Sequence, residues 1–138
     1  MAPGVTSATL ASISVNGSTA TSFFTGCGQD FVGVYCPDAS GVLANVNVTG
    51  FLLQVSRFVC QQGLGVEVAT DGGSASPSKF TIQNVNVFNY DKNGITCDNA
   101  GTVCSVSNSV TTGVGAIPLI AQNDIQVFGP QRRSPGTP

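Results

Sequence analysis

The chain has 138 residues, of which 9% are charged and 41% are hydrophobic, a length of about one domain that argues against a two-domain enzyme. So little charge excludes a disordered chain held open by charge repulsion. Five Lys and Arg residues against seven Asp and Glu, with no His, exclude a basic nucleic-acid-binding face and remove imidazole-dependent triads and zinc sites.

Membrane insertion is not expected, because no stretch approaches the ~18 apolar residues that a membrane helix needs. No secretory signal is visible at the start of the chain. Five cysteines are nevertheless many for a cytosolic protein, and their spacing does not suit a zinc knuckle. We therefore expect an oxidising compartment and a secreted, extracellular protein. No metal or other cofactor is expected, because the chain has no His and no dense acidic loop.

Two short motifs alternate along the chain. In chain order the segments cover residues 10–15, 32–36, 43–48, 64–68, 82–87, 93–97, 106–110 and 123–127. The first motif reads apolar-x-Asn/Ser-apolar-x-Val, and its fourth copy is looser, about one residue out of register. The second motif carries glycine at its second position, which Asp124 replaces in the last copy. Both motifs are short, β-branched and of period two, and they predict β-strands.

The repeat predicts the fold. The second position of the second motif recurs at steps of 32, 29 and 30 residues, through Gly33, Gly65, Gly94 and Asp124. A chain that winds around one axis stacks each strand on its equivalent one turn later, and such a repeat fits a β-solenoid of about four turns. A β-sandwich also has many short strands, but it does not predict the same motifs in constant order.

Alternation within the second motif assigns its side chains to two faces. Two columns are expected in the core: Val34, Val66, Ile95 and Ile125, and then Cys36, Val68, Cys97 and Val127. Two columns are expected to point outward: Gly33, Gly65, Gly94 and Asp124, and then Tyr35, Glu67, Thr96 and Gln126. In the first motif, Ser12, Asn45 and Asn84 share one position, where stacked side chains at a bend would hydrogen-bond from turn to turn.

Four segments carry a family resemblance. They are Gly26-Cys-Gly-Gln-Asp-Phe-Val-Gly-Val-Tyr35, Cys60-Gln-Gln-Gly-Leu-Gly-Val66, Tyr90-Asp-Lys-Asn-Gly-Ile-Thr96 and Ile120-Ala-Gln-Asn-Asp-Ile-Gln-Val127. They resemble secreted proteins of the right-handed parallel β-helix superfamily, the pectate-lyase-like fold, over roughly residues 8–127. The resemblance implies an all-β, right-handed parallel β-helix over residues 1–127, part of a longer β-helix. Residues 128–138 are expected to be a disordered tail rich in Pro and Arg.

Cysteine positions predict two disulfides. Cys27 and Cys60 occupy nearly the same position on successive turns, whose ~4.8 Å spacing suits a disulfide. Cys97 and Cys104 bracket a short loop with turn-forming residues. Cys36 would remain a free thiol in the core, and without His a catalytic role for it is not expected.

Candidate functional residues are few. Tyr35, Glu67, Thr96 and Gln126 would form a flat outward strip, where an aromatic ring beside polar groups suits a sugar; an ordinary solvent-facing strand remains the alternative. Glu67 and Asp124 would point outward from the same sheet about two turns apart, too far for a good carboxylate pair. Lys92 is expected in a solvated turn with Asp91, and no catalytic residue is assigned.

Three functions remain open from the sequence. The resemblance implies a non-catalytic secreted repeat domain associated with polysaccharide, and the outward strip supports it. The first alternative is a polysaccharide lyase or glycoside hydrolase of the pectin or uronate class, or a fragment of one. The second is a structural module that assembles end to end through uncapped β-helix ends, whose open strand edges favour self-association.

Overall fold

The computed structural model describes residues 7–20, 26–70, 77–115 and 117–129. Within them the chain forms strands and one 3-10 helix, η2 (Val55–Cys60). The strands are β1 (Ala8–Ala11), β2 (Ser14–Asn16), β3 (Val32–Pro37), β4 (Ser40–Ala44), β5 (Asn47–Phe51), β6 (Leu64–Ala69), β7 (Lys79–Gln83), β8 (Asn86–Tyr90), β9 (Asn93–Asp98), β10 (Val103–Ser107), β11 (Val110–Thr112) and β12 (Asn123–Phe128). None of the described segments is a helix long and apolar enough to cross a membrane.

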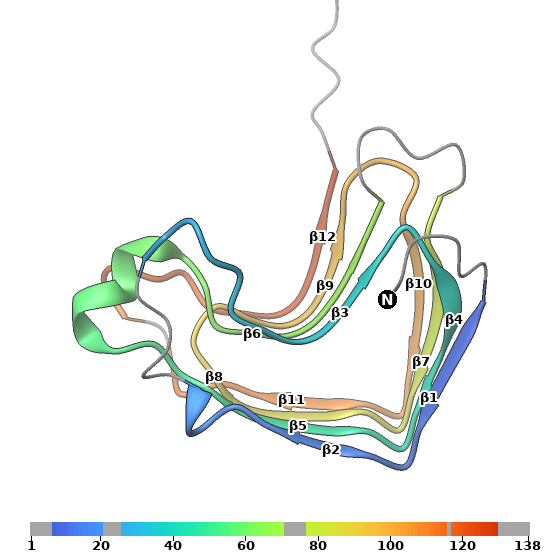
Figure 1. Ribbon diagram of the computed structural model, residues 1–138, viewed down its shortest axis with the longest axis horizontal. Helices are drawn as coiled ribbons and strands as arrows, with labels where there is room; N and C mark the ends of the chain where they lie inside the picture. Colours follow the sequence, from blue (N-terminus) through green and yellow to red (C-terminus); the bar gives the residue numbers. More distant parts are fainter. Residues whose placement is uncertain (1–6, 21–25, 71–76, 116, 130–138) are drawn as a thin grey trace, which may run out of the picture.

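The strands form three parallel sheets of four strands each. Sheet A has the order β1-β4-β7-β10, sheet B the order β2-β5-β8-β11, and sheet C the order β3-β6-β9-β12. The chain passes through sheets A, B and C in this order and then starts again, so each strand pairs with its equivalent in the next repeat (Figure 1). The predicted all-β architecture of stacked parallel strands is confirmed.

The first motif spans the bend from sheet A to sheet B in every repeat. The prediction of a fourth copy out of register is wrong, because Val106 pairs with Ile82 and Val110 pairs with Asn86. The copy only looks shifted, since Ser109 stands where the other copies have an apolar residue. Its hydroxyl accepts a hydrogen bond from the backbone N–H of Val85 at 3.1 Å.

The bend from sheet A to sheet B explains why Asn or Ser recurs at the third position of the first motif. Ser12, Asn45, Asn84 and Asn108 have φ values of 54°, 55°, 52° and 48°. This left-handed region is open to Asn because its short polar side chain compensates locally for the steric cost. Asn84 Nδ2 donates to Asn45 Oδ1 at 3.2 Å, as expected for a side-chain ladder.

The core lies between the three sheets and is tightest in the two middle repeats. Side chains that are completely buried come from all three sheets: Leu43, Val48, Val66, Val68, Ile82, Val87 and Ile95. The predicted core columns of sheet C hold in β3, β6 and β9 but not in β12. Ile125 is 51% exposed and Val127 78% exposed, because β12 is the last strand of sheet C among the described residues.

The glycine column does not point outward, contrary to the sequence prediction. A β-carbon at Gly65 would clash with the side chain of Val87 on sheet B, and one at Gly94 would lie 2.6 Å from Thr111 Cγ2 on the same sheet. The glycines therefore face the interior at the corner between sheets B and C. Strict alternation of side chains between the two faces predicted the opposite orientation. This alternation fails at each glycine, because the residue before the glycine and the second residue after it lie on the same outer surface.

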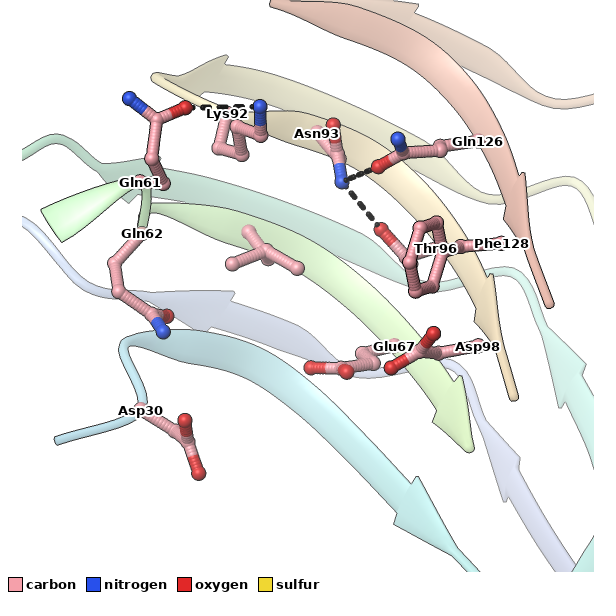
Figure 2. A pocket seen from close by; sticks show the side chains of 11 residues that line it. Asp30, Gln61, Gln62, Glu67, Lys92, Asn93, Thr96, Asp98, Gln126 and Phe128 are labelled. Carbon is pink, nitrogen blue, oxygen red and sulfur yellow. Dashed lines mark hydrogen bonds between the residues drawn. The ribbon is translucent and has the colours of Figure 1, made fainter. Parts of the chain in front are cut away.

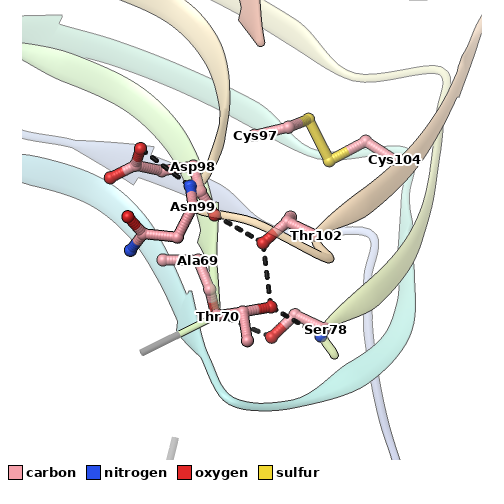
Figure 3. The surroundings of a disulfide bond; sticks show 8 residues. All are labelled: Ala69, Thr70, Ser78, Cys97, Asp98, Asn99, Thr102 and Cys104. Atoms are coloured by element: carbon pink, nitrogen blue, oxygen red, sulfur yellow. Dashed lines mark hydrogen bonds between the residues drawn. A yellow bond between two sulfur atoms is a disulfide. The ribbon is translucent and has the colours of Figure 1, made fainter. Parts of the chain in front are cut away.

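Both predicted disulfides are present. Cys27 and Cys60 join the segments before β3 and β6, with a Cα–Cα distance of 4.7 Å. Cys97 and Cys104 join β9 to β10, with a Cα–Cα distance of 6.3 Å (Figure 3). Cys36 is a buried free thiol, and its burial raises its pKa to about 11.

Hydroxyl groups stabilise the neighbouring corner between sheets C and A (Figure 3). Thr70 Oγ1 accepts from the backbone N–H of Ser78 at 2.8 Å and from Thr102 Oγ1 at 2.9 Å. Ser78 Oγ donates to the carbonyl of Ala69 at 2.7 Å and accepts from the N–H of Ala39 at 3.2 Å. Two of these bonds satisfy the backbone N–H groups of Ser78 and Ala39 at the bend.

Candidate functional site

The four residues of the predicted outward strip are neighbours across sheet C. Tyr35 pairs with Glu67, Glu67 pairs with Thr96, and Thr96 pairs with Gln126. Parallel strands in register place such side chains on one face at the ~4.8 Å strand spacing. The structure thus brings together the residues that the repeat placed in one column.

The strip is not flat, because sheet C is bent and its concave face points away from sheets A and B (Figure 1). A cavity of about 340 Å³ lies on this face, within the size range of small-molecule sites. Its lining consists of Asp30, Gln61 and Gln62 from the segments before β3 and β6, and of Leu64, Glu67, Lys92, Asn93, Thr96, Asp98, Gln126 and Phe128 (Figure 2). We call this cavity the sheet C pocket.

The floor of the sheet C pocket is a network of side-chain amides. Asn93 Nδ2 donates to Thr96 Oγ1 at 2.9 Å and to Gln126 Oε1 at 2.6 Å, and Asn123 Nδ2 donates to Asn93 Oδ1 at 3.0 Å. Thr96 is only 4% exposed, so the expectation that it lies on an open strip is wrong. Mutual hydrogen bonding holds these groups in fixed orientations, as a specific polar site requires.

The charges around the pocket are mostly negative. Asp30, Glu67 and Asp98 line it together with one cationic residue, Lys92. The Lys92 ammonium donates to Gln61 Oε1 at 3.0 Å and to the carbonyl of Ala121 at 3.1 Å, so this lysine is anchored at the pocket rather than in a solvated turn. Like-charge repulsion therefore disfavours an anionic ligand here.

Aromatic rings lie at the exposed side of the site. Phe128 lines the pocket and is 57% exposed, and Tyr35, in the same column as Glu67, is 41% exposed. Phe128 was not among the residues predicted from the sequence, because residues 128–138 were expected to be a tail, whereas β12 ends at Phe128. Phe128 is two residues after Gln126, so continuing the alternation of the strand by one step would have placed it on the same face. Residues 130–138 lie outside the described residues.

Two carboxyl groups outside the pocket have structural partners. Asp124 Oδ1 accepts a hydrogen bond from the Tyr90 hydroxyl at 2.6 Å, so Asp124 does not face Glu67 as the sequence suggested. Asp91 is buried and accepts a hydrogen bond from the N–H of Leu53. Burial raises the pKa of the Asp91 carboxyl, and the bond from Leu53 lowers it to a smaller extent.

A metal site is not visible in the described part of the chain. Among its residues, no three Asp, Glu, Cys or His side chains are close enough together to hold an ion. The groups that line the sheet C pocket can form hydrogen bonds, attract a positive charge and contact a ligand with an aromatic ring.

Comparison of the chain with protein-family models, with curated proteins and with solved structures finds no match.

Proposed function

We propose that the chain is a right-handed parallel β-helix of the pectate-lyase-like type and acts as a secreted, non-catalytic domain that binds carbohydrate in the sheet C pocket. The repeated passage through three parallel sheets supports the β-helix. Two disulfides are compatible with an extracellular location. The observation that carries the proposed function is a pocket with an ordered amide floor and an exposed aromatic ring at its edge.

The pocket's groups match the two sides of a sugar ring. Amide and carboxylate groups of Gln62, Glu67 and Gln126 supply donors and acceptors for hydroxyl groups. Phe128 supplies an apolar face for the C–H surface of the ring, and it lies at the end of β12, beside the polar floor. Sites for small ligands combine apolar contact with a few placed polar groups in this way.

The charge of the pocket narrows the ligand class. Three carboxylates against one lysine favour neutral sugars or amino sugars over uronates. An ammonium group on a sugar would lie in a negative field near Glu67 and Asp98. The pocket therefore argues against the pectin or uronate class as its ligand.

Binding experiments with three oligosaccharides test the proposal. We expect isothermal titration calorimetry to give a higher affinity for glucosamine oligomers and for neutral glucan oligomers than for oligogalacturonate. Phe128→Ala should weaken binding about tenfold, equivalent to about 1.4 kcal/mol. Phe88→Ala is the matched control, because Phe88 is also exposed but lies on sheet B, away from the pocket.

Charge is tested by Glu67→Gln, with Asp38→Asn as the control at an exposed carboxylate outside the pocket lining. Glu67→Gln should weaken the binding of glucosamine oligomers more than the binding of neutral glucans. Equal effects of Phe128→Ala and Phe88→Ala, or a preference for oligogalacturonate, would contradict the proposal.

A glycoside hydrolase is the second candidate function. Glu67 and Asp98 lie on neighbouring strands of sheet C, and Figure 2 draws their carboxylates on the same wall of the pocket. Glycosidases use two carboxyl groups, one of which is held protonated by apolar surroundings. The carboxyl with a pKa raised by burial, Asp91, instead contacts Leu53. Release of reducing ends that both Glu67→Gln and Asp98→Asn abolish would favour this candidate over binding alone.

A further inference from the structure

The two ends of the stacked sheets match one another as strand edges. Strands β10, β11 and β12 lie at one end, and β1, β2 and β3 at the other. In sheet C, β12 and β3 have six residues each, and in sheet B, β11 and β2 have three each. A second copy of this chain would therefore find a strand of equal length to pair with in these two sheets.

These six end strands carry little of the charge that discourages edge pairing. Natural sheets commonly protect their edges with charged side chains, among other features. Asp124 is the only charged residue in the six strands. Large apolar side chains are exposed at the β10, β11 and β12 end, among them Val103, Val110, Ile125 and Val127.

The glycine column sets a steric condition for adding a strand to sheet C. A β-carbon at Gly33 would lie 2.6 Å from the carbonyl oxygen of Gly65, one at Gly65 would lie 2.7 Å from that of Gly94, and one at Gly94 would lie 2.6 Å from that of Asp124. Distances below 3.0 Å are essentially never observed for a real β-carbon. In the backbone geometry of β3, β6 and β9, a β-carbon at this position would therefore collide with the next strand of sheet C.

Asp124 occupies this position in β12. The pairing of β12 with β9 joins Asn123 to Asn93 and Ile125 to Ile95, which is the register that β9 has with β6 around its glycine. The Asp124 side chain is held in place by the buried Tyr90 hydroxyl. We infer that the β-carbon of Asp124 closes the β12 edge to the β3 edge of a second copy, and so keeps the matching ends from stacking.

Size measurements on two variants at one position test this inference. Asp124→Gly removes the β-carbon, and Asp124→Ala keeps it; both lose the charge and the bond to Tyr90. Light scattering over a concentration series should give the wild type and Asp124→Ala a mass near 14.0 kDa at every concentration. Asp124→Gly should give a mass that rises at least twofold with concentration.

Two results would overturn the inference. One is a mass for folded Asp124→Gly that stays equal to that of Asp124→Ala at every concentration. The other is assembly of the wild type or of Asp124→Ala to the same extent as Asp124→Gly, because the β-carbon would then block nothing.

Gly94→Ala tests the same steric condition inside the chain, and this test holds even where Asp124→Gly fails to fold. It should lower the thermal midpoint by several degrees, because the new β-carbon meets both the carbonyl oxygen of Asp124 and the side chain of Thr111. The contact with the Asp124 carbonyl should also speed hydrogen exchange in β12. Gly28→Ala is the control, since a β-carbon there meets nothing within 4 Å. Equal stability of the two variants would remove the steric basis of the inference.

Discussion

Tyr90 and Asp124 show how one buried pair connects two sheets at the residue scale. Tyr90 ends β8 in sheet B, is completely buried, and donates its hydroxyl proton to Asp124 on β12 in sheet C. Burial, and to a smaller extent the hydrogen bond to Asp124, raise the pKa of the Tyr90 phenol to about 12. Loss of the proton would place two negative charges next to one another.

The stability of the fold should therefore decrease at alkaline pH. The folded-state pKa of Tyr90 exceeds its unfolded value, so its contribution is fully present below pH 10 and is lost as pH rises through about 12. A shift of two units corresponds to about 2 to 3 kcal/mol. Phenolate absorbance, measured in a Tyr35→Phe background, should show this transition, and Asp124→Ala should lower its pKa. An unchanged titration in Asp124→Ala would show that the hydrogen bond has no effect.

At the element scale, the bend between sheets A and B combines a backbone requirement with a side-chain ladder. The sequence motif predicted both the bend and the column of Ser12, Asn45 and Asn84, because left-handed turn residues and stacked amides depend on local sequence and on the repeat. The register of the fourth copy was harder to predict, since Ser109 interrupts the apolar pattern that marks the position in the other copies.

Substitutions at Asn84 separate the contribution of the positive φ from that of the hydrogen bond to Asn45. Asn84→Ala should lower the free energy of unfolding by about 1 to 2 kcal/mol, because alanine pays the steric cost of positive φ and cannot bond to Asn45. Asn84→Gly should cost less, since glycine loses only the hydrogen bond. Urea unfolding measures both, with Gln83→Ala as a control at an exposed strand residue. A larger loss in the glycine variant would argue that backbone strain is not the main term.

At the scale of the whole molecule, the two disulfides constrain the chain over different lengths. Cys27 and Cys60 are 33 residues apart, whereas Cys97 and Cys104 are 7 apart. The buried Cys36 thiol, with its raised pKa, is a poor nucleophile for disulfide exchange. The two disulfides can therefore be compared independently.

Removal of the longer loop's disulfide should be the more destabilising change. Chain entropy predicts a loss of about 4 kcal/mol for the double variant Cys27→Ala with Cys60→Ala, and about 2 kcal/mol for Cys97→Ala with Cys104→Ala. Denaturant unfolding under non-reducing conditions gives both values. A greater loss for the shorter loop would indicate that packing of the buried Cys97 outweighs the entropy of the unfolded chain.

The repeat in the sequence predicted the stacked parallel strands, the column of Tyr35, Glu67, Thr96 and Gln126, and the disulfide between Cys27 and Cys60, because a strand in register places equivalent residues side by side. The disulfide between Cys97 and Cys104 was predicted from the short loop between them. Only the tertiary structure decided that Thr96 lies at the floor of a pocket, that Phe128 borders it, and that the glycine position faces the core. These depend on the bend of sheet C and on which strand or sheet lies next to each residue, which a periodic pattern within one strand does not contain.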